Sequence, residues 1–147
     1  MSQGTEFVNS WLDAVNRGDL DGLVDMCQPD IELSNPDGSV RGADGVRSAF
    51  GSLIEATSER TSQVSNIIEA RDSVVAEFVF SGRHTGPLTT PMGPVPATGK
   101  TLTMAIIGVY DLRDGKLAAS RGMFDRLDLA VQLGLLGAPA PAEGLAP

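Results

Sequence analysis

The only histidine in the chain, His84, is predicted to lie at the end of an apolar strand face. Between residues 74 and 84, apolar side chains occupy alternate positions, and the alternation continues past Gly82 to His84. An imidazole at such a position bonds a backbone carbonyl in the core, faces solvent at the strand end, or faces a pocket, where it transfers protons near neutral pH. His84 is therefore a candidate catalytic residue.

Asp125 and Arg121 lie on a second face of this kind, in the segment 117–125. The alternate residues of this face are apolar except for these two opposite charges. A carboxylate on an apolar face is costly unless it is paired or protonated, so its presence needs a reason. Two interpretations follow: Asp125 neutralises Arg121, or Asp125 is an acid/base placed for proton transfer.

Other catalytic and metal-binding motifs are not supported by the spacing. The segment 93–101 resembles a phosphate-binding loop, but it has five residues between its glycines where the motif has four, and a strand pattern follows it. One histidine and one cysteine cannot supply a structural metal site. Cys27 lies on the apolar stripe of a helix, where cysteine usually packs as a small hydrophobe, which disfavours a nucleophilic pair with His84. We expect neither metal nor cofactor.

The composition narrows the class of protein. A chain of 147 residues predicts one domain, and its net charge of −8 disfavours binding to nucleic acids and to anionic membranes. The apolar stretches are shorter than the roughly 18 residues of a membrane-spanning helix. The first residues lack the pattern of a signal peptide, and Cys27 has no second cysteine for a disulfide. These features predict a cytoplasmic location.

The first part of the chain predicts three helices. Apolar residues at helical spacing over 7–15 indicate the first, which Gly18 ends in a left-handed conformation. Asp19 is placed to cap a shorter second helix. A third amphipathic helix is predicted over 46–54 and is expected to fray in the polar run 57–62.

The second part predicts consecutive strands joined by short turns. A proline-containing loop interrupts them, and a last helical turn precedes a flexible tail. The predicted ranges are strands near 31–33, 63–71, 73–84, 100–112 and 116–126, a further short strand that ends at Val40, the loop 86–99, the turn 127–131 and the tail 137–147. Helices on one face of a curved, mostly antiparallel sheet give the α+β class, a domain over 1–136 and a pocket on the concave face.

Several segments together resemble the SnoaL-like polyketide cyclases of the nuclear transport factor 2-like superfamily. The matching segments are 11–21, 29–33, 82–88, 98–100, 114–116 and 125–134. The resemblance implies a cone-shaped pocket, often a homodimer, and an acid/base aspartate seven residues before the glutamine of Gln132-Leu-Gly, which is Asp125. The strand over 102–108 lacks the polar group usual in such cyclases, and Met123 replaces a common aromatic residue.

The predicted pocket wall is therefore drier than the family pattern, which suits an apolar polyketide substrate. The predicted substrate-binding residues are Trp11, Phe50, Phe78, Phe80, Met104, Ile106, Arg121 and Met123. We also expect the loop 86–98 to cover the pocket mouth, and we expect a homodimer through an outer sheet face that carries Val75, Val79 and Val109.

The first functional hypothesis is a cofactor-independent polyketide cyclase of antibiotic biosynthesis that closes a ring by an aldol reaction, with Asp125 as acid/base. The second is a cycloaddition of a polyene, in which the pocket folds the chain and Arg121 or His84 polarises a carbonyl. An isomerase, an epoxide-opening enzyme and a binding module without catalysis remain alternatives.

Overall fold

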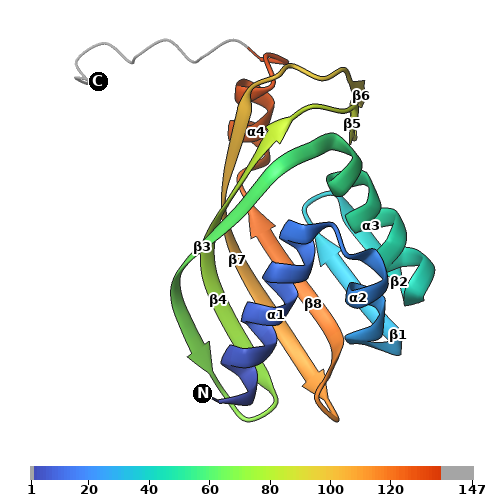
Figure 1. Cartoon of the computed structure of the whole chain (residues 1–147), viewed down its shortest axis with the longest axis vertical. Helices are drawn as coiled ribbons and strands as arrows, with labels where there is room; N and C mark the ends of the chain where they lie inside the picture. Colours follow the sequence, from blue (N-terminus) through green and yellow to red (C-terminus); the bar gives the residue numbers. More distant parts are fainter. Residues whose placement is uncertain (1, 137–147) are drawn as a thin grey trace.

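Four helices and two sheets make up residues 2–136, the part of the chain that the computed structural model describes (Figure 1). The helices are α1 (Gln3–Arg17), α2 (Leu20–Asp25), α3 (Gly42–Ala56) and α4 (Arg126–Gln132). The strands are β1 (Cys27–Asn35), β2 (Gly38–Arg41), β3 (Thr57–Glu69), β4 (Ser73–His84), β5 (Leu88–Thr90), β6 (Gly93–Val95), β7 (Thr101–Arg113) and β8 (Lys116–Phe124). The α+β class is confirmed, and the predicted tail 137–147 lies outside the described residues.

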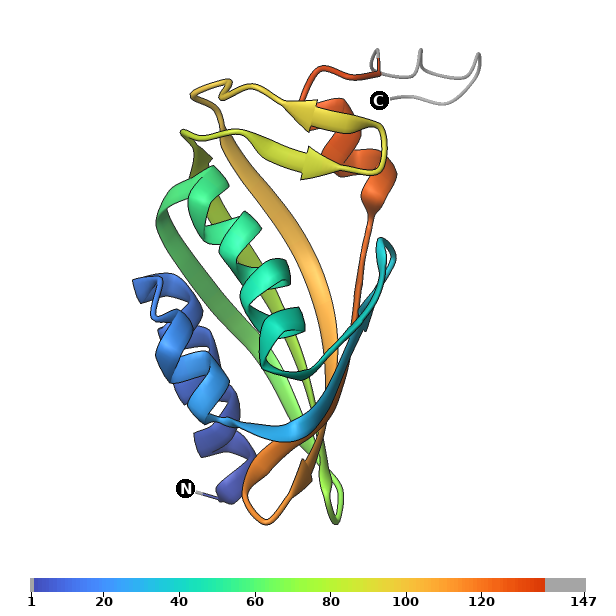
Figure 2. The same ribbon diagram turned by 90° about the vertical axis from the view of Figure 1, so that its right-hand side faces the viewer.

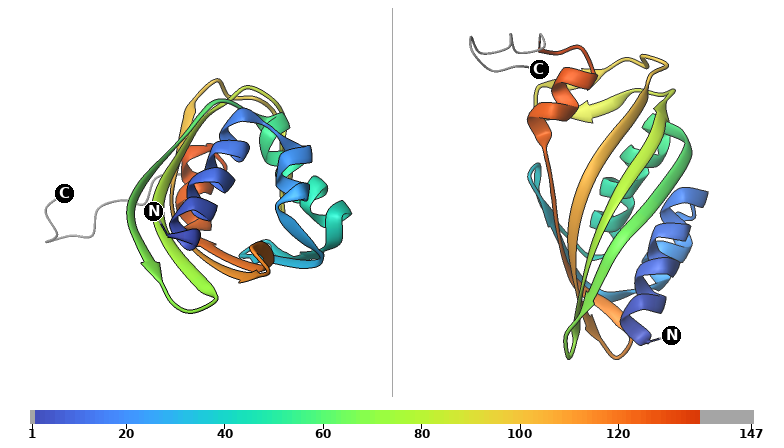
Figure 3. Two further views of the ribbon diagram at one scale, coloured as in Figure 1. Left: turned by 60° about the horizontal axis from the view of Figure 1, so that its bottom comes forward. Right: turned by 90° about the vertical axis from the view of Figure 1, so that its left-hand side faces the viewer.

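Six strands form one curved sheet in the order β2, β1, β8, β7, β4, β3. All neighbours are antiparallel except β1 and β8, which are parallel. The sheet bends around α1, α2 and α3, which lie on its concave side (Figure 3). The hairpin β5–β6 and the helix α4 lie at one end of the sheet, beside the C-terminal end of α3 (Figure 2).

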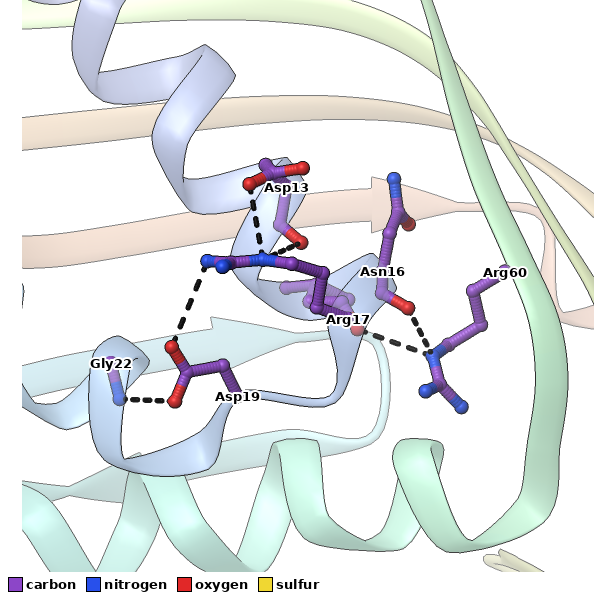
Figure 4. Close-up of polar contacts among 7 residues, drawn as sticks. Asp13, Asn16, Arg17, Asp19, Gly22 and Arg60 are labelled. Carbon is purple, nitrogen blue, oxygen red and sulfur yellow. Dashed lines mark hydrogen bonds and ion pairs between the residues drawn. The ribbon is translucent and has the colours of Figure 1, made fainter.

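The corner between α1 and α2 follows the predicted signals (Figure 4). Gly18 ends α1 with a left-handed φ of 71°, and the Asp19 carboxylate caps α2 by accepting the Gly22 N–H at 2.9 Å. Arg60 on β3 donates its Nε–H to the carbonyls of Val15 and Asn16 at 3.2 Å each. This arginine therefore bonds two carbonyls in the last turn of α1, where the helix offers no N–H four residues further along.

The prediction that the third helix frays through 57–62 is wrong. The helix α3 ends at Ala56, and Thr57 already belongs to β3, where it pairs with His84 of β4. The Thr57 hydroxyl donates to the Leu53 carbonyl at 2.6 Å, which closes the last turn of the helix. Pairing with the far end of β4 fixes this segment as strand, and tertiary contacts of this kind override local propensity.

The loop 86–99 contains more regular structure than predicted. Residues 88–90 and 93–95 pair as the hairpin β5–β6, with Leu88 opposite Val95. Pro94 fits there because both strands are edges, where a missing N–H is tolerated. Leu88 and Val95 pack with Leu102, Leu129 and Leu133, so the hairpin and α4 share a small core.

The main core lies between the concave face of the sheet and the helices. It includes Trp11 and Val15 from α1, Leu23 from α2, Val46 from α3 and Ile31 from β1. Within residues 2–136, no helix combines the length and the apolar character needed to span a membrane.

Candidate functional site

A cavity of about 520 Å³ opens on the concave side of the sheet. Strands β4, β7 and β8 form its floor, α1 and α3 contribute its walls, and the hairpin β5–β6 and α4 contribute residues at its mouth. Its volume falls in the range of small-molecule sites. The predicted pocket on the concave face is thus confirmed.

Aromatic side chains from the two longest helices form one wall. The Trp11 and Phe50 rings meet edge to face with centroids 5.3 Å apart, and Trp11 stacks on Phe7 at 5.8 Å. The predicted positions of Trp11 and Phe50 on the cavity wall are confirmed.

Alternate residues of β4 and β7 form the floor as predicted. Phe78 and Phe80 point inward from β4, while Met104 and Ile106 point inward from β7. The strands pair with Phe78 opposite Ile106 and Phe80 opposite Met104, so the four side chains form one apolar patch.

The predicted face of β8 is wrong because the strand contains a β-bulge. Leu117 pairs with Leu112, but the next pair is Ala119 with Asp111, so Ala118 is an extra residue on β8. One extra residue moves every later side chain to the opposite face. Accordingly, the cavity is lined by Ser120, Gly122 and Phe124 and not by the predicted residues Arg121, Met123 and Asp125.

Arg121 and Met123 lie on the outer face of the sheet. The Arg121 guanidinium pairs with the Asp111 carboxylate at 2.8 Å. This hydrogen bond lowers the pKa of Asp111 and raises that of Arg121, so the pair remains charged at neutral pH. Met123 is 62% exposed. The charge of Arg121 in the segment 117–125 therefore belongs to an ion pair on the outer face, whose partner, Asp111, the sequence pattern did not indicate.

Asp125 is exposed and serves as the N-cap of α4. Its carboxylate accepts the backbone N–H of Asp128 at 2.9 Å. It therefore has a structural partner and does not contact the cavity that the sequence assigned to it.

We expect Asp125→Ala to lower the free energy of unfolding by about 1 kcal/mol, because α4 loses its cap. Asp125→Asn keeps an oxygen that accepts the same N–H and should change stability by less than about 0.5 kcal/mol. Thermal unfolding followed by circular dichroism compares the two variants. Equal losses in both would show that the carboxylate charge, and not the cap, stabilises this end of the protein.

His84 is fully buried, but it is not among the residues that line the cavity. Its Nδ1 lies 2.9 Å from the Thr98 hydroxyl and accepts the Thr98 N–H at 3.2 Å. Its backbone bonds Gly99 and Lys100, so the chain returning to β7 covers the end of β4. The alternation that buries His84 is confirmed, whereas its predicted position at the cavity is wrong because this returning segment covers it.

Among the cavity-lining residues that the structure describes, the charged ones lie at the rim. Asp37 in the turn after β1 and Arg126 at the start of α4 form an ion pair at 2.8 Å. Both are close to half exposed, so the pair adds little to stability. The interior is lined by neutral groups.

Sequence analysis missed several polar residues of the cavity, and the most deeply placed aromatic one among them is Tyr110. It is 4% exposed, and burial raises the pKa of its phenol to about 12, so the hydroxyl stays protonated at neutral pH. The alternation that brings Met104, Ile106 and Gly108 inward continues to Tyr110, which is the signal that would have found it.

Solved structures of several Streptomyces proteins superpose on this chain. AclR, a proposed hydroxylase from Streptomyces galilaeus, superposes with a TM-score of 0.80 at 25% identity over 95% of this chain and 86% of AclR. TsrD from Streptomyces laurentii superposes with a TM-score of 0.78 at 28% identity, over 91% of this chain and 96% of TsrD. IdmH, a proposed polyketide cyclase from Streptomyces antibioticus, superposes with a TM-score of 0.73 at 25% identity, over 90% of this chain and 99% of IdmH.

No curated protein matches the sequence. The model of the SnoaL-like domain matches residues 8–120, which include most of α1, the helices α2 and α3, and most of the sheet. The chain therefore belongs to the SnoaL-like domain family.

Proposed function

We propose that this protein is a cofactor-independent cyclase that closes a ring in an apolar, polyketide-derived chain. The observation that carries the proposal is the cavity of about 520 Å³, whose described lining is apolar or neutral inside and charged only at the rim pair Asp37–Arg126. Membership of the SnoaL-like family and the likeness to IdmH support a polyketide substrate.

The chemistry we propose is a cycloaddition. In this reaction a diene and an alkene form two carbon–carbon bonds in one step, and no proton is transferred. The cavity contributes by holding a flexible chain with its reacting ends together, an effect that can lower a barrier by roughly 7–11 kcal/mol. The position of Asp125 outside the cavity favours this reaction over an aldol closure, which needs an acid/base beside the substrate.

The test uses a linear trienone, in which a short alkyl tether joins an enone to a diene and which also closes slowly in water. We expect saturating protein to accelerate the closure by at least about 100-fold over buffer, because the bound chain is restricted to folded conformations. Product formation is followed by chromatography. A trienone that binds the protein but closes at the rate seen in buffer would contradict the proposal.

We also propose that the protein is a homodimer through the outer face of the sheet. Val79, Ile107 and Met123 are 42%, 48% and 62% exposed on this face, and Ile107 pairs with Met123. Exposed apolar patches of this kind mark interfaces.

Light scattering of the double variant Ile107→Glu, Met123→Glu should give half the mass of the wild type, because two carboxylates replace the apolar centre of the interface. Met92→Glu changes a 70% exposed residue on the hairpin turn and should leave the mass unchanged. A monomeric wild type at micromolar concentration would refute the dimer.

A further inference from the structure

The ring of Tyr110 lies along β7 and covers Gly108. A methyl group on Gly108 would lie 2.6 Å from the Tyr110 hydroxyl oxygen and 2.8 Å from the ring carbon that bears it. The hydroxyl therefore lies directly over the Gly108 backbone, in space that only glycine leaves open. The ring also packs on Phe7 with centroids 6.0 Å apart, which restricts its position from the helix side.

An empty space adjoins this hydroxyl. Gly122 pairs with Gly108 across β7 and β8, and it lines the cavity on the face that the β-bulge turns inward. A methyl group on Gly122 would meet no atom within 4 Å. Two facing glycines thus leave a niche in the floor, between apolar side chains and Ser120, and the Tyr110 hydroxyl borders it.

Tyr110 lines the cavity, so its hydroxyl can meet a ligand bound there. A hydroxyl that a ligand cuts off from water loses hydrogen bonds to water unless the ligand replaces them. A ligand that brings an acceptor oxygen into the niche would supply such a bond.

We propose that the Tyr110 hydroxyl and the niche over Gly122 bind the carbonyl oxygen of an otherwise apolar substrate. This inference rests on the proposed function and specifies its substrate: a polyene chain whose carbonyl is conjugated to the alkene that reacts. The hydrogen bond draws electron density from that alkene and strengthens as negative charge grows on the oxygen. Tyr110 keeps its proton throughout, so no base is required.

The test uses two probes of the same carbon skeleton, the enone benzylideneacetone and the hydrocarbon β-ethylstyrene. We expect the carbonyl stretch of bound benzylideneacetone to shift to lower frequency in the wild type. Tyr110→Phe retains the ring and removes the hydroxyl, so this shift should disappear and affinity for the enone should fall roughly 3- to 10-fold. Affinity for β-ethylstyrene should stay unchanged.

Gly122→Ala tests the niche separately. Its methyl group would occupy the space for the carbonyl oxygen, so this variant should also weaken enone binding while Tyr110 is intact. Gly51→Ala is the matched control. Gly51 lies on α3 and does not line the cavity, and a methyl group there would meet Leu20 of α2 at an ordinary 3.7 Å.

Each remaining outcome is decisive. If the wild type binds both probes and Tyr110→Phe leaves the enone affinity and carbonyl frequency unchanged, the role of Tyr110 is refuted and the cavity proposal stands. If the wild type binds neither probe, both proposals are refuted.

Discussion

Trp11→Ala is expected to lower the free energy of unfolding by roughly 3–5 kcal/mol, the usual loss for a large buried aromatic residue. Trp11 is 2% exposed and contacts both Phe7 and Phe50 through its ring. Its removal leaves α1 and α3 without their shared contact at the cavity wall, and the void cannot be filled by small movements of neighbouring side chains. Because Trp11 is the only tryptophan, the variant has no tryptophan fluorescence to report its unfolding. The loss is therefore measured by urea unfolding followed by circular dichroism.

Met92→Ala is the control for this prediction. It also removes a large apolar side chain, but one that is 70% exposed on the hairpin turn, and should cost less than about 0.5 kcal/mol. Equal losses in the two variants would contradict the wall that the structure assigns to Trp11.

Met104→Glu is expected to reduce affinity for β-ethylstyrene by at least about 100-fold. Met104 is half-buried in the apolar floor opposite Phe80, and a carboxylate there has no basic partner among the described lining residues other than Arg126 at the rim. An unpaired charge in such a place costs several kcal/mol when the ligand excludes water from it. Equilibrium dialysis measures the affinity.

Thr103→Glu introduces the same charge one residue earlier, on the opposite and exposed face of β7. It should bind β-ethylstyrene as the wild type does. Met104→Gln, which adds polarity without charge, should lose an intermediate amount of affinity. Wild-type affinity in Met104→Glu would place the binding site elsewhere.

Periodicity predicted the parts of the site that lie on regular elements. The period of two over β4 and β7 placed Phe78, Phe80, Met104 and Ile106 on one face, and the structure has them there. Helical spacing likewise placed Trp11 toward the sheet. These positions follow from local geometry, which the sequence carries directly.

The errors arise where a distant segment decides the local structure. Leu117, Ala118 and Ala119 are all compatible with either face of a strand, so the sequence does not mark the bulge that reverses Arg121 and Asp125. The parallel pairing of β1 with β8 and the covering of His84 by residues 98–100 also depend on contacts between remote parts of the chain. Local patterns cannot indicate such contacts.

The central claim is that the cavity closes a ring by confinement, without an acid/base carboxylate. The most direct measurement is the rate of trienone closure from about pH 3 to 8, which spans most of the range in which an aspartate titrates, in the wild type and in Asp125→Asn. Our account predicts the same rate at every pH and in both proteins, within about twofold. A rate that follows the titration of a single carboxyl group, and that falls roughly 100-fold or more in Asp125→Asn, would contradict it.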